Sequence, residues 1–475
     1  MAIKSPNRYQ LTALPAAVED YVEFDDPVRA YDAMIDAIDP ESIGLFKEHK
    51  KVGNSPYDPS SMLKLLVYGY SYGWRSSRKL ERACYHNMSF IWLMGGLKPD
   101  HKTIANFKKK HEKTLKKVLK RTAQICLDLD LIDGNCLFVD GSKVRANACI
   151  DQTKSQDKWK EALEDVDGRI DAIMEEIDRI DAEENGSFVK LSEELKDANR
   201  LREKISSIIQ EAKLKERKQV NGTDTDAIKM KSRQGTHAGF NTQIVVDGKN
   251  GLIASADVTN DSNDREQFSN QINQAIETLG IKPNSAVADA GYSNVNDLKK
   301  IEDEEIEVVV PSQKQAEKNP KDDPFGKDKF TYDAERDEYV CPMGERMYKS
   351  YFSKEKRQWI YRMKKPGVCK ECSQFGVCTE AKRGRTISRL ENEELKERLE
   401  ARYESESGQA IYKQRKAKVE LPFGHIKRTL NGGAFLSRGI KAVKAEFSIF
   451  ASCFNIARMI TLLGGVEGMI ETLKG

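Results

Sequence analysis

The 475-residue sequence predicts an α/β protein whose mixed core follows an all-α region and carries two inserts. Three observations lead to this fold class. Apolar residues at helical spacing fill residues 20–130, and strand-like and helix-like apolar segments alternate from Leu137 to Val310. A long charged repeat and a cysteine cluster interrupt that alternation, and we interpret them as insertions.

Residues 1–130 are expected to form a helical, helix-turn-helix-like region. Ser60–Tyr70 and Ser77–His86 have helical apolar spacing and are joined by a turn at Gly73. Asp100 is a good N-cap for a long helix that follows it.

A basic run marks that last helix. Lys102 to Arg121 contains nine Lys or Arg residues and one acid, Glu112. The run is either a solvated helix face or a face that contacts phosphates, and the second interpretation makes Lys108, Lys109 and Lys110 candidates for DNA binding.

The core is expected within residues 131–475. Its elements alternate between strands and helices after an initial hairpin whose turn is Asp247–Gly251. The expected strands are Leu137–Asp140, Thr242–Val246, Leu252–Val258, Ser285–Asp289 and Ile306–Val310, and the expected helices are Asp264–Leu279 and Asn296–Glu302. This mixed five-stranded pattern resembles the ribonuclease-H-like core.

Two inserts are expected in this core. Residues 151–215 have apolar steps of three and four, broken at Asn185-Gly186-Ser187, which predicts an antiparallel helical hairpin. Residues 313–385 form a cysteine-rich insert that begins with a polar linker, 313–335. The apolar positions of the hairpin are Trp159, Leu163, Val166, Ile170, Ile173, Ile177, Ile180, Leu191, Leu195, Ala198, Leu201, Ile205 and Ile208.

Composition excludes some classes of protein. The 78 Lys and Arg residues nearly balance the 75 Asp and Glu residues, so the chain is not uniformly basic, although segregated charge still permits DNA binding. The start lacks an apolar signal segment, and Phe447–Leu463 contains Asn455 and Arg458, which favours a buried helix over a membrane span. We therefore expect a cytoplasmic protein with reduced cysteines.

Three carboxylates are candidates for chemistry. Asp140 and Asp289 end predicted strands, and Glu420 lies on a helical stretch among many cations. Clustered carboxylates need cations, and their hard oxygen atoms suit Mg²⁺ or Mn²⁺. Two such ions could activate a nucleophile and stabilise a leaving oxygen. Each acid alone could also be an ordinary turn or cap residue.

Several motifs together resemble the DDE transposases of bacterial insertion sequences that carry a Tyr-Arg-Glu-Lys signature. The resemblance covers nearly the whole chain. The motifs that carry it are Tyr57-Asp58-Pro59, Tyr68-Gly69-Tyr70-Ser71-Tyr72-Gly73, Arg75-Ser76-Ser77-Arg78-Lys79-Leu80-Glu81, Pro99-Asp100-His101-Lys102-Thr103-Ile104, Val139-Asp140-Gly141-Ser142-Lys143, Ala146-Asn147-Ala148, Met230-Lys231-Ser232, Asp289-Ala290-Gly291-Tyr292 and Val419-Glu420-Leu421-Pro422-Phe423-Gly424-His425-Ile426-Lys427.

The resemblance implies a ribonuclease-H-like catalytic domain with Asp140, Asp289 and Glu420 as a triad that binds two Mg²⁺ or Mn²⁺ ions. It further implies DNA-contacting roles for Tyr412, Arg415 and Lys427. This sequence departs from the family pattern in one place: four residues separate Arg415 from Glu420, where the family has three. Lys416 has the family spacing, so either residue could fill the basic role.

Four cysteines fall within 38 residues of the second insert. Cys369 and Cys372 have chelating spacing, and Cys341 and Cys378 complete a set that could close a tetrahedral structural Zn²⁺ site. The alternative is four reduced free thiols.

The function expected from the resemblance is DNA transposition: metal-dependent cleavage and strand transfer at the ends of an insertion sequence. Double-stranded DNA and further copies of the chain are the expected partners. A Walker A motif is absent, so we expect no nucleotide cofactor. The alternatives are a nuclease on the same fold that does not join strands, and a non-catalytic DNA-binding derivative of a transposase.

Overall fold

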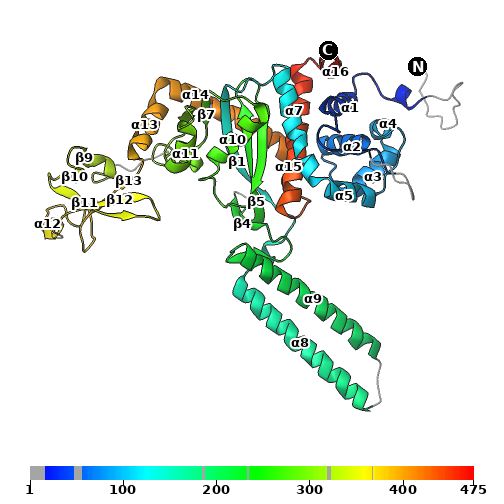
Figure 1. The fold of residues 1–475 in the computed structure, drawn as a ribbon, viewed down its shortest axis with the longest axis horizontal. Coiled ribbons are helices and arrows are strands. Elements are labelled where there is room, and N and C mark those ends of the chain that lie inside the picture. The colour runs from blue at the N-terminus through cyan, green and yellow to red at the C-terminus, as the bar shows by residue number, and fades with distance from the viewer. Residues whose placement is uncertain are drawn as a thin grey trace, which may run out of the picture. The chain divides into compact units, whose positions relative to one another are not determined.

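The chain divides into two compact units in the computed structural model, Met1–Val287 with Gln414–Gly475 and Ala288–Lys413 (Figure 1). The residues that the structure describes are 17–47, 56–183, 188–232, 235–317, 323–365 and 367–474.

The first unit begins with small helices, as predicted for the N-terminal region. These are η1 (Val18–Tyr21), α1 (Pro27–Ile38), α2 (Pro59–Ser71), α3 (Ser77–His86), α4 (Met88–Leu93), α5 (His101–Lys110), α6 (Glu112–Leu115) and α7 (Lys117–Asp128). Asp100 caps α5 by accepting a hydrogen bond from the Thr103 N–H at 2.6 Å. Gly69 is required where α2 meets α3, because a Cβ atom there would lie 2.2 Å from the Leu80 side chain.

The prediction of one long helix after Asp100 is wrong, because the basic run is divided among the three helices α5, α6 and α7. The chain turns at His111 and again at Lys116. Both α6 and α7 pack against α15 (Ile440–Leu462), and the turns allow each to bury its apolar face there.

The sheet of the first unit is mixed, as predicted. The strands are β1 (Cys136–Arg145), β4 (Ile228–Ser232), β5 (Gly235–Asp247), β6 (Ile253–Thr259) and β7 (Ser285–Val287). β5 pairs antiparallel with β1, β4 and β6, and β7 pairs parallel to β1. Helix α10 (Phe268–Leu279) packs on β5 and β6, whereas α15 packs on β6.

The first strand is longer than predicted. The Asp140-Gly141 pair suggests a turn, but β1 continues to Arg145 and stays paired with β5 along Leu137–Arg145. Asp140 therefore lies in the middle of a strand, because cross-strand hydrogen bonding outweighs the local turn preference.

Helix α15 confirms the buried helix expected near Phe447. It is long and apolar enough to cross a membrane by length and composition, but 72% of its most apolar window is buried inside the protein. Its contacts with α2, α7 and β6 make it a core helix of this unit, and α16 (Val466–Lys474) follows and packs on α1.

The hairpin insert consists of α8 (Gln156–Glu183) and α9 (Phe188–Leu214), which lie side by side in Figure 1. A short pair of strands, β2 (Thr153–Ser155) and β3 (Gln219–Asn221), closes its base, next to η2 (Ile150–Gln152). The predicted break at Asn185-Gly186-Ser187 and the side chains of Ile180 and Leu191 lie outside the described residues. The buried cluster of the hairpin is Trp159, Val166, Ile205, Ile208, Ile209, Ala212 and Val220.

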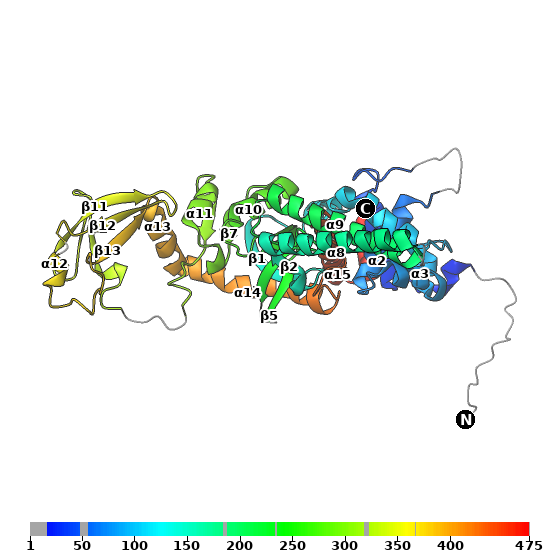
Figure 2. The ribbon, with the colours of Figure 1, turned by 90° about the horizontal axis from the view of Figure 1, so that it is seen from below.

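The second unit contains an antiparallel sheet that the sequence did not predict. Its order is β13-β12-β11-β10-β9, and β11, β12 and β13 lie next to one another in both ribbon views (Figures 1 and 2). The prediction of a linker over residues 313–335 is therefore wrong in part, because β9 (Thr331–Asp333) belongs to this sheet. The elements are η3 (Ala290–Tyr292), α11 (Val295–Glu302), β8 (Glu307–Val309), η4 (Lys327–Lys329), β9 (Thr331–Asp333), β10 (Glu338–Val340), β11 (Arg346–Ser353), β12 (Gln358–Arg362), α12 (Gly367–Lys370), β13 (Thr386–Leu390), α13 (Glu393–Glu404) and the start of α14 (Glu406–Arg428). From Gln414 onward, α14 belongs to the first unit.

Candidate active site

Asp140 on β1 meets the signature helix α14. The Arg415 guanidinium lies 3.1 Å from the Asp140 carboxylate, and the two side chains are only 14% and 19% exposed. Partial burial strengthens such a pair, since water screens it less. The sequence separates these two residues by 275 positions, and the fold brings them together.

Ser142 is the next residue of β1 on the face of Asp140, because side chains alternate along a strand. The Lys427 ammonium, from the last turns of α14, donates a hydrogen bond to the Ser142 hydroxyl. Two basic residues of the predicted signature therefore contact two residues of the predicted Val-Asp-Gly-Ser-Lys motif.

Glu420 lies on α14, seven residues before Lys427, and is exposed. Seven residues are close to two helical turns, so Glu420 and Lys427 share one side of the helix. The carboxylate of Glu420 is therefore open to a ligand on the side of α14 from which Lys427 reaches β1.

The choice between Arg415 and Lys416 is a matter of side-chain direction. Arg415 is largely buried against Asp140, whereas Lys416 is exposed. The spacing to Glu420 favours Lys416, but the contact with β1 belongs to Arg415.

The remaining signature residues belong to the second unit. Asp289 follows β7 and caps η3, with its carboxylate accepting a hydrogen bond from the Gly291 N–H at 2.8 Å. Tyr412 packs edge-on against Tyr403, with ring centroids 5.0 Å apart.

The three candidate lysines of α5 differ in their surroundings. Lys109 and Lys110 are exposed. The Lys108 ammonium instead turns inward, donates to the Arg75 carbonyl at 2.6 Å and lies 5.2 Å from the Tyr70 ring centre. The three lysines therefore do not form one uniform solvated face.

A polar cluster on the other face of the sheet was missed by the sequence interpretation. Asp264 accepts hydrogen bonds from the side-chain amides of Asn241 (2.6 Å) and Gln243 (2.7 Å), and its oxygens lie 3.3 Å from the Lys143 ammonium. The alternation of Asn241 and Gln243 at buried positions of a strand is the signal that could have revealed it.

The four cysteines predicted to bind zinc line one small cavity in the second unit, together with Phe330 and Met363. Burial raises the pKa of the Cys378 thiol above its usual value, although the nearby Arg385 opposes that shift. Within the described ranges, no group of three or more His, Cys, Asp or Glu residues is arranged to hold a metal ion. The structure therefore gives no support to the predicted zinc site.

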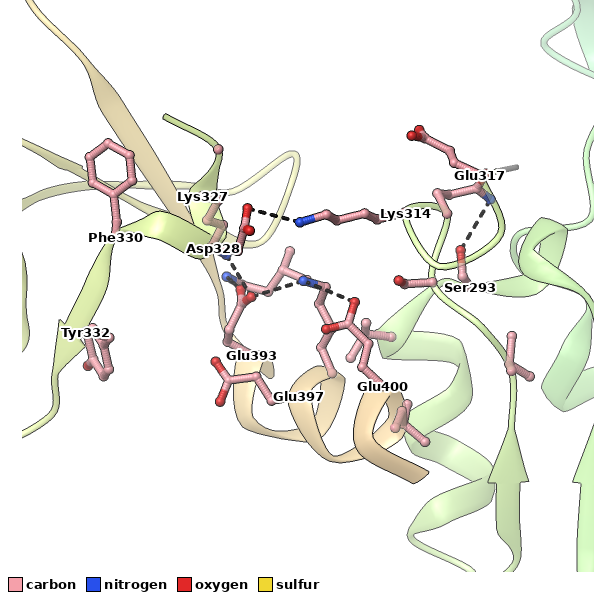
Figure 3. A pocket seen from close by; sticks show the side chains of 18 of the residues that line it. Ser293, Lys314, Glu317, Lys327, Asp328, Phe330, Tyr332, Glu393, Glu397 and Glu400 are labelled. Carbon is pink, nitrogen blue, oxygen red and sulfur yellow. Dashed lines mark hydrogen bonds and ion pairs between the residues drawn. The ribbon is translucent and has the colours of Figure 1, made fainter. Parts of the chain in front are cut away.

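A cavity of about 970 Å³ lies in the second unit beside α13 (Figure 3). Its lysines are all matched by acids: Lys314 pairs with Asp328 at 3.0 Å, and Lys327 pairs with Glu393 at 2.7 Å. Lys396 lies 3.3 Å from Glu393. The charged residues that line the cavity are Lys314, Lys327, Lys396, Glu317, Asp323, Asp328, Glu393, Glu397 and Glu400, so acids outnumber bases.

Comparisons with known families match two parts of the chain. Residues 16–110, the helical N-terminal region, match the family described as transposase domain (DUF772). Residues 340–460, which include Tyr412, Arg415, Glu420 and Lys427, match the transposase DDE domain family. The comparisons with curated proteins and with solved structures gave no match. The two family matches confirm that the chain resembles the DDE transposases of insertion-sequence type.

Proposed function

We propose that this protein is a DNA transposase that cleaves the ends of an insertion sequence and transfers them to target DNA. The observation that carries the proposal is the pairing of α14 with β1. Arg415 contacts Asp140, and Lys427 contacts Ser142, so cations that suit phosphate lie beside a carboxylate that suits a metal ion.

The sheet of the first unit supports a ribonuclease-H-like core for this proposal. Three antiparallel strands, β1, β5 and β6, are followed by α10 and then by β7, which runs parallel to β1. This is the strand–strand–strand–helix–strand pattern expected from the sequence, and it supports residues 131–475 as the catalytic domain, with the hairpin (151–215) and the cysteine-containing segment (313–385) as inserts.

Asp140, Asp289 and Glu420 are the residues that would hold Mg²⁺ or Mn²⁺. All three offer carboxylate oxygens, which these hard cations prefer, and DDE transposase domains generally use divalent metal ions. Two bound ions would activate the attacking oxygen and stabilise the leaving one.

The chain's own residues bind and orient the DNA in this proposal. Arg415 and Lys427 present cations to backbone phosphates, which positions the strand without reading its sequence. Tyr412 makes a further backbone contact, and the helical region 1–130 holds the transposon end, with Lys109 and Lys110 on its exposed surface. Two ends must be joined, so the active form is a homo-oligomer on nucleoid DNA.

A plasmid-nicking assay tests the assignment of the triad. Asp140→Asn, Asp289→Asn and Glu420→Gln should each abolish Mg²⁺-dependent nicking of supercoiled DNA while duplex binding remains. Glu161→Gln, an exposed neutral substitution on α8, is the matched control and should nick normally. Full nicking by any of the three variants would remove that residue from the catalytic set.

A strand-transfer assay separates the proposal from its alternatives. Inverted repeats flanking the gene supply the natural end sequence, and a pre-cut end of that sequence should be joined to target DNA. Nicking without joining would indicate a nuclease, and binding without nicking would indicate a non-catalytic DNA-binding protein.

A further inference from the structure

A second cavity, of about 510 Å³, lies within the first unit between the N-terminal helices and α15. Its lining comes from the start of α3, from α5 and α6, and from the loop and first turns of α15. The charged and hydroxyl side chains that line it are Arg75, Lys108, Lys109, Arg438, Glu112, Glu446, Ser76, Ser77 and Ser437. Four bases face two acids, so the cavity has a net positive charge.

The acid at its base is already engaged. Glu446 is 1% exposed and pairs with Arg75 at 3.1 Å, and Arg75 is 7% exposed. The Glu446 carboxylate also accepts hydrogen bonds from the N–H groups of Leu436 (3.2 Å) and Ser437 (2.8 Å). Its charge therefore balances Arg75 and leaves little for a second cation.

Lys108 is that second cation. Its Nζ atom bonds to the Arg75 carbonyl, and no acid in the described part of the chain lies within ion-pair distance of it. Burial, with a smaller contribution from repulsion by the Arg75 guanidinium, lowers the pKa of Lys108 to about 8, although Glu446 opposes the shift. An anion bound here would supply the charge that the protein does not.

The mouth of the cavity is also suited to an anion. The N-cap of α3, Ser76, makes no side-chain capping hydrogen bond, so backbone N–H groups of the first turn remain available. The positive end of the helix dipole lies there as well. Lys109 and Arg438 are exposed beside the opening.

We infer that this cavity binds a backbone phosphate of duplex DNA, at a position separate from the scissile phosphate. The inference rests on the proposed function and deepens it. The loop that lines the cavity pairs with the end of β1, since the Phe435 N–H donates to the Arg145 carbonyl at 2.8 Å. Arg145 is five residues from Asp140, or roughly 17 Å along the strand. That length corresponds to about five base pairs of duplex.

Salt dependence of DNA binding tests the inference. The probe is a 40-base-pair duplex of arbitrary sequence, titrated at several KCl concentrations with the full chain carrying Asp140→Asn to prevent cleavage. The double variant Lys109→Ala/Arg438→Ala should reduce the slope of log K against log [KCl] by about two, because each lost phosphate contact removes about one. The double variant Lys204→Ala/Lys213→Ala removes two exposed cations from α9 and should leave the slope unchanged.

A second pair of variants tests the cavity itself without altering its cations. Ala105 lines the cavity and is exposed, so Ala105→Glu adds an anion with little risk to folding, and Ala105→Gln is its neutral control. We expect Ala105→Glu to weaken duplex binding about tenfold or more relative to Ala105→Gln, since it blocks and repels the phosphate.

The outcomes separate this inference from the proposed function. Equal slopes for the two double variants, or equal affinities for Ala105→Glu and Ala105→Gln, would overturn the cavity assignment while duplex binding itself stands. Absence of any duplex binding would refute the proposed function. Calorimetry with inorganic phosphate is the third measurement. If Ala105→Glu loses phosphate binding but keeps its affinity for the duplex, the cavity binds a free anion. The assignment of the cavity to DNA would then be wrong.

Discussion

The two cavities have opposite electrostatic character although each is built around a buried carboxylate. Glu446 lies under a cavity where bases outnumber acids, and Glu393, 3% exposed, lies in a cavity where acids outnumber bases. Glu446 engages one cation, whereas Glu393 engages both Lys327 and Lys396. Net charge, and not the presence of lysine or a buried ion pair, therefore distinguishes a surface suited to DNA from one that repels it.

The surroundings of Glu393 and Lys327 show how the acidic cavity engages its own cations. Burial alone would raise the pKa of Glu393, but Lys327 and the Leu390 N–H hold its pKa below the usual value. Burial lowers the pKa of Lys327, while its bond to Glu393 opposes that shift. The lysines of the acidic cavity are thus engaged by its acids and have little charge left for an external anion.

The largest expected effect is the removal of the carboxylate under the basic cavity. Glu446→Ala leaves the Arg75 guanidinium buried without its partner and should lower the free energy of unfolding by about 3–5 kcal/mol. Urea denaturation measures this. Glu397→Ala, on the exposed side of the acidic cavity, is the control and should change stability by less than about 1 kcal/mol. If Glu446→Ala lowers the free energy of unfolding by less than about 1 kcal/mol, the ion pair between Arg75 and Glu446 does not stabilise the fold.

Lys108 should reveal its burial through pH. Its folded pKa of about 8 is below the ordinary lysine value of 10.5, so between these values the unfolded chain holds a proton that the folded chain does not. The free energy of unfolding therefore rises with pH above about pH 8. Below about pH 8 the folded protein carries the full cost of burying the charged ammonium. Lys108→Met removes the penalty, so wild type should gain about 2 kcal/mol relative to the variant between pH 7 and pH 9.5. Urea denaturation at pH 7 and pH 9.5 measures the free energy of unfolding of wild type and variant. If the difference between the two proteins is the same at both pH values, Lys108 is not buried as a cation.

The smallest effect belongs to the acidic cavity. Lys314 and Asp328 form an ion pair at its edge with side chains 66% and 50% exposed, which water screens. Lys314→Ala should change stability by less than about 1 kcal/mol. It should also leave the salt dependence of duplex binding unchanged. A reduced slope of log K against log [KCl] for Lys314→Ala would mean that the acidic cavity also contacts DNA, which contradicts the difference drawn between the two cavities.

The sequence predicts the elements of the first unit well where local signals and tertiary packing agree. Ser77–His86 is found as α3, and the hairpin turn at Asp247–Gly251 lies where its residues indicate. Prediction fails where cross-strand pairing overrides a local turn signal, as at Asp140-Gly141. It also fails for β9 to β13, whose short strands carry mixed polar and aromatic residues without a continuous apolar face.

The site shows a similar division. Motif resemblance selects Asp140, Arg415 and Lys427, and the fold brings Arg415 to Asp140 and Lys427 to Ser142. Spacing alone cannot decide between Arg415 and Lys416, because neighbouring helical residues point about 100° apart and only packing shows which one faces the sheet. Cysteine spacing likewise predicts which thiols gather, but not whether they hold a metal.

The paired strands β2 and β3 at the base of the helical hairpin form a point at which the hairpin could be removed or replaced. Thr153 pairs with Asn221 and Ser155 with Gln219, so the chain enters and leaves α8 and α9 at positions one strand spacing apart. The hairpin has its own buried cluster, and its removal would leave two ends that a tight turn can join. Lineages could therefore gain, lose or exchange this arm without moving β1 relative to β5, and an engineer could graft a different accessory domain at the same point.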